Sequence, residues 1–139
     1  MNNHHQNSET ASDTAPELEP KSSQAPLGAA TDWLMAFEGA LTSDNVCTLA
    51  ALFEKDGIWR DIVSVSWHLQ TIIGAQEIAQ AFVRGDVSTR PVKLRIASER
   101  TPPRWVARAG TECLEALFAF ETQVGRGSGV LRLVPSKKT

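Results

Sequence analysis

The sequence has few cysteines and no long apolar run, and these absences exclude several classes of protein. Only two of its 139 residues are cysteines, Cys47 and Cys113, and their positions fit no metal-binding spacing. Both stand among apolar neighbours, so we expect reduced cysteines in the core of a cytoplasmic protein. No stretch approaches the roughly 20 apolar residues of a membrane-spanning helix. The amino terminus lacks the features of a signal peptide or a mitochondrial transit peptide.

Motifs for cofactor binding and covalent catalysis are also missing. The glycines Gly125, Gly127 and Gly129 have the wrong spacing for a dinucleotide fingerprint, and they join two predicted strands. We interpret this segment as a hairpin turn. The sequence has no Ser/His/Asp order and no carboxylate–histidine cluster with metal spacing, so nothing in it requires a metal or a bound cofactor.

Charge is unevenly distributed along the chain, although the formal net charge is only −2. Residues 1–30 carry four acids and one base, whereas the part from Arg84 onward carries eleven bases and five acids. A basic region can face nucleic acid, a phosphorylated cofactor or another domain. The bases are scattered singly and lack the interleaved aromatic residues of a base-stacking surface. These features favour a solvated strand face, and we do not expect nucleic-acid binding.

Residues 1–30 predict a disordered tail, and residues 31–139 predict one domain. The tail is rich in polar residues, proline and alanine, with Leu18 and Leu27 as its large apolar residues. Such a segment cannot bury enough apolar surface to offset the entropy lost on ordering. The neighbouring His4 and His5 are interpreted as incidental, because a metal site needs a fixed scaffold.

The periodicity of apolar residues predicts three helices followed by antiparallel strands. A helix is expected from the capping pair Thr31-Asp32 to about Leu41, and a second helix from Val46 to Phe53. A third, short helix is expected around Ile78 to Val83. Strands are predicted at 58–63, 92–97, 104–109, 112–124 and 128–134, and the segment 65–73 is either a strand or a structured loop. Helices gathered on one face of an antiparallel sheet make an α+β roll.

With this order of elements, residues 31–134 resemble the nuclear transport factor 2-like superfamily, also called SnoaL-like. That resemblance implies a cone-shaped roll, in which a curved antiparallel sheet wraps around amino-terminal helices and encloses a pocket. The segments LAALFEKDGIWRD, SWHLQTIIG and FETQVGRGSGVLRLV are similar to the amino-terminal domain that precedes the flavin-binding portion of flavin-containing monooxygenase-like oxidoreductases. The resemblance implies a domain that is inactive alone, with FAD and NADPH bound only in a longer parent protein.

The chain departs from the family pattern at its carboxyl end. The family usually closes the cone with another long strand after a segment like 130–134, and this chain ends at Thr139. A missing strand leaves an unpaired sheet edge. We therefore expect an incomplete cone and a chain prone to self-association: either the chain is a fragment, or a partner or a second copy covers the edge.

Asp61 and His68 are the candidate catalytic residues. In superfamily enzymes such as ketosteroid isomerase-like and epoxide hydrolase-like members, pocket carboxylates act as bases, so the resemblance makes Asp61 the candidate base in an alternative function, that of a cofactor-independent isomerase, cyclase or hydrolase. The structural alternative is a salt bridge with Arg60 or Arg95, or a hydrogen bond in a turn. His68 is either a proton shuttle or a half-buried structural histidine.

Four aromatic residues are candidates for lining a pocket that takes a small apolar ligand, or for plain core. They are Trp59, Trp67, Phe118 and Phe120. Strand alternation places Trp59 and Asp61 on one face of the first strand, and Ile58 and Ile62 on the other. The bulk of tryptophan favours the Trp59 face as the inner one. The β-branched isoleucines favour the opposite arrangement.

Overall fold

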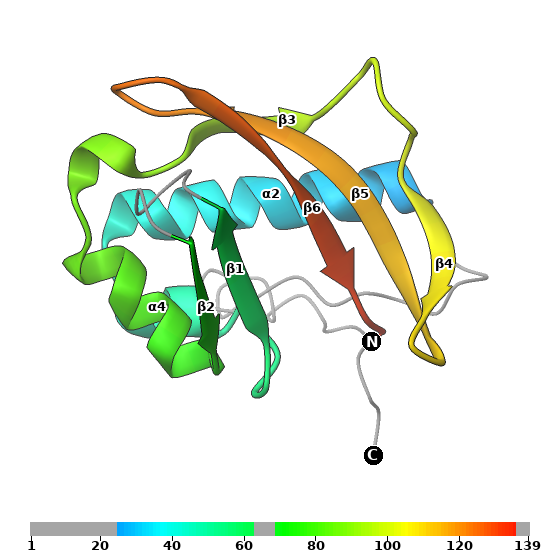
Figure 1. Cartoon of the computed structure of the whole chain (residues 1–139), viewed down its shortest axis with the longest axis horizontal. Helices are drawn as coiled ribbons and strands as arrows, with labels where there is room; N and C mark the ends of the chain where they lie inside the picture. Colours follow the sequence, from blue (N-terminus) through cyan, green and yellow to red (C-terminus); the bar gives the residue numbers. More distant parts are fainter. Residues whose placement is uncertain (1–24, 63–68, 136–139) are drawn as a thin grey trace, which may run out of the picture.

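A computed structural model describes residues 25–62 and 69–135 of the chain. The described part is a mixed α+β structure with helices packed against antiparallel sheets (Figure 1). Its helices are α2 (Pro26–Ser43), α3 (Val46–Ala50) and α4 (Ala75–Arg84), with the 3-10 helix η3 (Val87–Thr89) after α4. The α+β class expected from the sequence is therefore confirmed.

Helix α2 begins five residues earlier than predicted. Pro26 is among its first residues, a position where the fixed φ of proline suits a helix and its missing N–H costs nothing. Ala29 and Ala30 are buried, so the boundary placed at residue 30 is wrong by about one helical turn. The helix ends where Asp44 adopts a left-handed conformation (φ 60°) and donates its N–H to the carbonyls of Ala40 and Leu41.

The next helix starts as predicted but is shorter. The side chain of Asn45 accepts a hydrogen bond from the backbone N–H of Thr48 (3.2 Å), which caps the first turn of α3. The helix ends at Ala50 instead of Phe53. The indole N–H of Trp33 donates to the carbonyl of Leu52 (3.1 Å), so the chain leaving α3 is bound to α2.

The strands form two antiparallel sheets. β1 (Ile58–Ile62) pairs with β2 (Leu69–Ile73), which settles the latter segment as a strand. In the four-stranded sheet, the long strand β5 (Thr111–Glu121) is paired with β6 (Arg126–Leu133) along one edge. Its other edge is shared by β3 (Val92–Ile96) and β4 (Arg104–Arg108). The hairpin turn lies at residues 122–125, ahead of its predicted position, where Thr122 N–H donates to the Gly125 carbonyl (2.7 Å).

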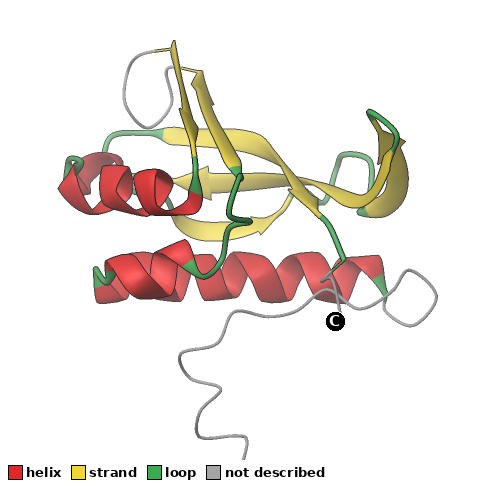
Figure 2. Cartoon of the chain, turned by 90° about the horizontal axis from the view of Figure 1, so that it is seen from below, coloured by secondary structure: helices red, strands yellow, loops and turns green. Residues whose placement is uncertain are grey.

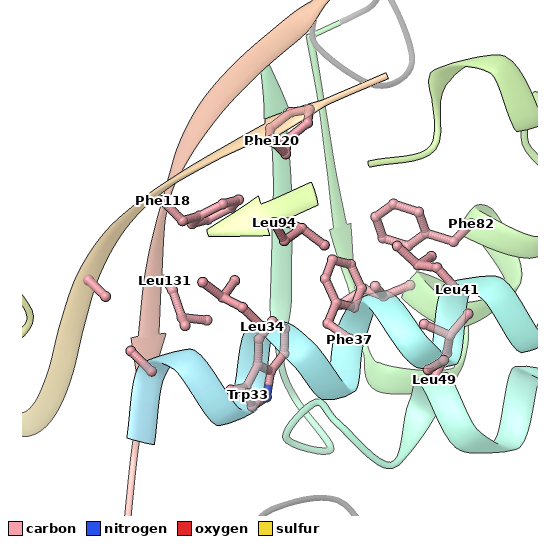
Figure 3. Close-up of a cluster of buried hydrophobic side chains, with 14 of the residues drawn as sticks. Trp33, Leu34, Phe37, Leu41, Leu49, Phe82, Leu94, Phe118, Phe120 and Leu131 are labelled. Carbon is pink, nitrogen blue, oxygen red and sulfur yellow. The ribbon is translucent and has the colours of Figure 1, made fainter. Parts of the chain in front are cut away.

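The core lies between α2 and the inner face of the four-stranded sheet. Figure 2 shows α2 running along one side of the strands. Leu34 and Phe37 of α2 are 1% exposed, and Figure 3 shows Phe118 and Leu94 of the sheet pointing toward them. This interior burial of apolar surface is the main favourable contribution to folding.

The carboxylate of Glu38 in α2 binds the backbone of β3 at a β-bulge. Lys93 has a positive φ (55°), and the pairing register between β3 and β5 shifts between Val92 and Arg95. The two carboxylate oxygens of Glu38 accept hydrogen bonds from the backbone N–H groups of Lys93 and Leu94, both at 2.9 Å. The bulge disrupts the regular alternation that the sequence predicted, and Val92 is exposed while Leu94 is buried.

Arg90 joins the carboxyl ends of two helices. Its guanidinium donates to the carbonyls of Leu41 in α2 (3.3 Å) and Val83 in α4 (3.1 Å), and it pairs with the Asp44 carboxylate (2.9 Å). Its side chain is only 14% exposed. A cation at this place complements the partial negative charge of the helix ends.

The two cysteines differ in their surroundings. Cys113 in β5 is buried, and burial raises the pKa of its thiol. Cys47 in α3 is exposed, so its predicted place in the core is wrong. Within the described ranges, no helix combines the length and the apolar character that crossing a membrane requires.

Candidate functional site

The structure decides which face of β1 is turned inward. The Trp59 ring packs edge-on against Phe82 (ring centroids 4.7 Å apart) and lies 6.2 Å from Phe37 of α2. Ile58 and its cross-strand neighbour Ile73 are 64% and 62% exposed. The arrangement with the Trp59 face inside is therefore confirmed, and the arrangement with the isoleucines inside is wrong.

The two candidate catalytic residues are only partly within the described structure. Asp61 lies in β1, where its Cα is opposite that of Gln70 in β2, and its side chain is outside the described part. Trp67 and His68 belong to residues 63–68, which also lie outside it. The roles predicted for these three residues stay predictions.

Both phenylalanines proposed as pocket residues are part of the buried core. Phe118 and Phe120 are 8% and 3% exposed, and their ring centroids are 6.1 Å apart. The Phe118 ring lies directly against Gly129 of β6, where a Cβ atom would come within 2.6 Å of it. The glycine makes room for the ring of its cross-strand partner. That either ring also contacts a ligand stays a prediction.

Polar groups are scarce in the interior of the described part. Among the residues whose side chains the structure describes, 25–60 and 70–135, Thr89 is the buried polar one, and its hydroxyl donates to the carbonyl of Asp86 (3.0 Å). In the same ranges, no three His, Cys, Asp or Glu side chains are placed so that they could hold a metal ion. The indole N–H of Trp105 is buried without a hydrogen-bond partner among the described residues.

The charged residues gather on the outer face of the four-stranded sheet. Residues directly opposite one another in paired strands share a face. Glu115 is opposite Arg104 and Arg132, and Glu121 is opposite Arg126. We call this surface the arginine face. It carries six bases and two acids, namely Lys93, Arg95, Arg104, Arg108, Arg126 and Arg132 with Glu115 and Glu121.

Glu115 is the centre of the tightest ion cluster on this face. The Arg108 guanidinium binds both of its carboxylate oxygens, at 2.8 and 3.0 Å, and Arg132 Nε donates to it at 2.7 Å. Arg104 lies 3.8 Å away. These hydrogen bonds and charges lower the pKa of Glu115 from 4.5 to about 2. The carboxylate therefore stays charged at neutral pH and fixes the directions of the arginine side chains.

A second, looser cluster surrounds Glu121 at the other end of β5. Lys93 Nζ and Arg95 Nη1 lie 3.7 and 3.6 Å from its carboxylate. These contacts are longer than those of Glu115, and the three side chains are at least 40% exposed. Since Arg95 pairs with Glu121, and the Arg60 guanidinium donates to Thr71 Oγ1 (3.4 Å), both arginines suggested as partners of Asp61 have other described contacts.

The β6 edge is unpaired within the described structure, because β6 pairs with β5 alone. The carbonyl of Leu117 accepts from Ala97 N–H (2.9 Å) on the β3 side, so the peptide groups of Leu117 point away from β6. Its partner Val130 must then direct its own N–H and C=O away from β5. By alternation, Ser128 has the same orientation. The free edge of β6 therefore presents outward-facing peptide groups.

Sequence reasoning identified the separate arginines but missed their grouping around two glutamates. The signal was present in the predicted strands 104–109 and 112–124, which a turn at Gly110 folds into a hairpin. Pairing them from that turn places Arg104 opposite Glu115. Glu38 and Arg90 were missed because their partners lie more than 40 residues away in the sequence, for instance Leu94 and Leu41.

No protein-family model and no curated protein matches this sequence. The resemblance to the nuclear transport factor 2-like superfamily therefore remains a proposal, and function is argued from the residues of this chain.

Proposed function

We propose that this chain is an accessory domain of a flavin-dependent, monooxygenase-like oxidoreductase and performs no reaction by itself. The similarity of the segments around Trp59 and Gly129 to the domain that precedes the flavin-binding portion supports this proposal. In that role the domain has the cone-shaped roll of the nuclear transport factor 2-like superfamily, and it shapes the surroundings of a small apolar substrate. FAD and NADPH are bound by the oxidoreductase.

The apolar interior is the observation that carries the proposal. Acid–base catalysis needs an ionisable group within hydrogen-bond reach of the substrate. In the described part, the strongly paired carboxylate of Glu115 lies on the outer face of the sheet, and the residues facing α2 from β5 are apolar. A domain with this distribution of side chains suits packing and support better than proton transfer.

The experiment uses the full chain with FAD and NADPH. We expect that adding the chain leaves the fluorescence of free FAD unchanged and does not increase the rate of NADPH oxidation. Addition of a flavin-dependent monooxygenase provides the positive control for both signals. Saturable quenching of FAD fluorescence by the chain alone would contradict the assignment of the cofactors to a separate protein.

A second candidate function is a cofactor-independent isomerase, cyclase or hydrolase with Asp61 as its base. The inward packing of Trp59 favours it, because Trp59 and Asp61 stand two residues apart in β1. Asp61→Asn tests this function in a screen of small ketones and epoxides. A turnover that falls by a factor of about 100 or more with an unchanged melting temperature supports the second function. Absence of turnover by the unaltered chain favours the accessory role.

A further inference from the structure

We infer that the free edge of β6 binds an extended acidic segment of a partner protein, which adds to the sheet as a strand. Two independent observations lead to this inference, the orientation of the peptide groups along β6 and the position of its two arginines. The inference does not depend on the oxidoreductase assignment, because it uses only residues of the four-stranded sheet.

The peptide groups provide the first observation. Ser128 and Val130 direct their N–H and C=O groups away from β5, and within the described part no other strand pairs with them. Such a row of groups is a template for an added strand, whose main chain supplies the missing hydrogen bonds. Val130 is also 51% exposed, so an added strand would cover an apolar side chain.

The arginines provide the second observation. Arg126 and Arg132 stand at the two ends of β6, six residues apart, which corresponds to about 20 Å along a strand. Each lies opposite a glutamate of β5, and Arg132 uses its Nε in the hydrogen bond with Glu115. Because an arginine has five N–H donors, most of those of Arg132 remain for a carboxylate on the other side. The arginine face has an excess of four positive charges, although the whole chain has a net charge of −2.

These positions define the pattern of the added strand. Its acidic residues stand on the outer face, six residues apart, next to Arg126 and Arg132. Its intervening residues on the other face are apolar, because they stand beside the inner face of the sheet, where Leu131 of β6 is buried. The segment is thus acidic on one face and apolar on the other, with the alternation of a strand.

A second copy of this chain fits the edge less well. Antiparallel pairing of two β6 strands centred near Gly129 would place Arg126 of one copy opposite Arg132 of the other. Like charges directly opposite each other in a sheet are destabilising. Nucleic acid also fits poorly, because the glutamates among the arginines repel phosphates and the face has no aromatic side chains for stacking.

The binding test uses the full chain and the synthetic peptide Glu-Val-Thr-Val-Thr-Val-Glu with a fluorescent label. A control peptide, Val-Glu-Thr-Val-Thr-Glu-Val, has the same composition, but its glutamates stand four residues apart instead of six, and its valines are divided between the two faces of a strand. We expect saturable binding of the first peptide, at least tenfold tighter than that of the control. Equal affinities would show attraction by charge alone and would overturn the inference.

Variants of the chain locate the binding site. Ser128→Pro removes an outward N–H without touching the β5–β6 ladder, and proline is tolerated at such edge positions. We expect it to weaken peptide binding at least tenfold. Ser98→Pro is the matched control, because Ser98 is the second residue of the turn in which Arg100 N–H donates to the Ala97 carbonyl, a place where proline is favoured. An effect of Ser98→Pro equal to that of Ser128→Pro would contradict an edge site.

Arginine variants test the charges. Arg132→Ala and Arg126→Ala are each expected to weaken binding about fivefold, the factor that corresponds to a charge contact of about 1 kcal/mol. The control Arg84→Ala removes the same charge from α4, away from this edge (Figure 1), and is expected to leave binding unchanged. The melting temperatures of all variants show whether a loss of peptide affinity reflects unfolding. The Arg132→Lys and Arg126→Lys variants keep the charge and should therefore recover part of the affinity.

A second copy of the chain or a nucleic acid, bound in place of an acidic strand, would give different results in these experiments. If the edge takes a second copy, sedimentation shows a dimer that Ser128→Pro dissociates, and the peptide does not bind. If the face takes nucleic acid, a labelled single-stranded DNA oligonucleotide binds, the arginine variants weaken it, and Ser128→Pro has no effect. Either result would overturn the acidic-strand inference.

Discussion

The two faces of β5 differ sharply although their residues alternate along one strand. Leu114, Ala116 and Phe118 are buried against the helix side, while Glu115 and Glu121 between and beyond them hold arginines on the outer side. The inner face depends on shape, because packed apolar atoms leave little room for change. The outer face depends on charge, which water and salt weaken. The same strand should therefore respond very differently to substitutions one residue apart.

The largest effect on stability is expected from truncating a side chain on the inner face of β5. Leu114 is fully buried, so Leu114→Ala should lower the free energy of unfolding by about 3 kcal/mol. Leu117→Ala removes the same atoms from the half-buried outer side and should cost less than about 1 kcal/mol. Urea denaturation of both variants measures the difference. Equal losses would mean that the outer face is as tightly packed as the inner one.

The second prediction concerns Glu38, whose side chain reaches from α2 to the backbone of β3. Glu38→Ala leaves the N–H groups of Lys93 and Leu94 without their carboxylate partner, at the cost of about 2 kcal/mol. Hydrogen exchange of these two amides should accelerate more than that of the other β3 amides. An unchanged exchange rate would show that water replaces the carboxylate without loss.

A smaller effect is expected from overfilling the inner face. Gly129→Ala brings a methyl group against the Phe118 ring, which must move, and should cost about 1 to 2 kcal/mol. Gly125→Ala is the matched control in the turn before β6, because a Cβ at Gly125 meets no atom within 4 Å. Thermal unfolding of the two variants should therefore separate them. Similar melting temperatures would indicate that the Phe118 ring is loosely held.

The smallest effect is expected on the outer face, and it depends on pH. The pKa of Glu115 is lowered to about 2, so its ion cluster stabilises the fold above pH 4.5 and loses this contribution as the pH falls toward 2. Glu115→Gln should destabilise the protein by about 1 kcal/mol or less at neutral pH, since the pairs are half-exposed. The difference from the unaltered protein should shrink between pH 4.5 and 2. A difference that does not vary across this range would contradict the charged role of Glu115.

The sequence predicted the parts of the fold that depend on local pattern. Alternation in 112–124 predicted the two faces of β5 correctly, and the bulk of Trp59 correctly indicated the inner face of β1. The boundary at Thr31 was wrong because Pro26 and the alanines after it read as tail, whereas their burial against the sheet makes them helical. Burial is a property of the folded molecule, and short alanine-rich stretches carry little signal of it.

Contacts between distant residues could not be predicted from pattern alone. The bulge at Lys93 depends on Glu38, which stands 55 residues earlier, and no periodicity links the two. The grouping of arginines around Glu115 needs the register of three strands, and a shift of one residue would reverse every face. The candidate site at Asp61 was likewise inferred from local pattern, because Asp61 shares a strand face with Trp59. The structure locates the backbone of Asp61 but not its carboxylate.

The guanidinium of Arg90 makes the ends of two helices depend on each other. Since one side chain satisfies carbonyls in both α2 and α4, neither end can fray without releasing the other. We expect these two segments to open as a single unit in native-state hydrogen exchange, with a common free energy and a common dependence on denaturant. The order in which these segments open would then depend on one cation, at the ends of two helices.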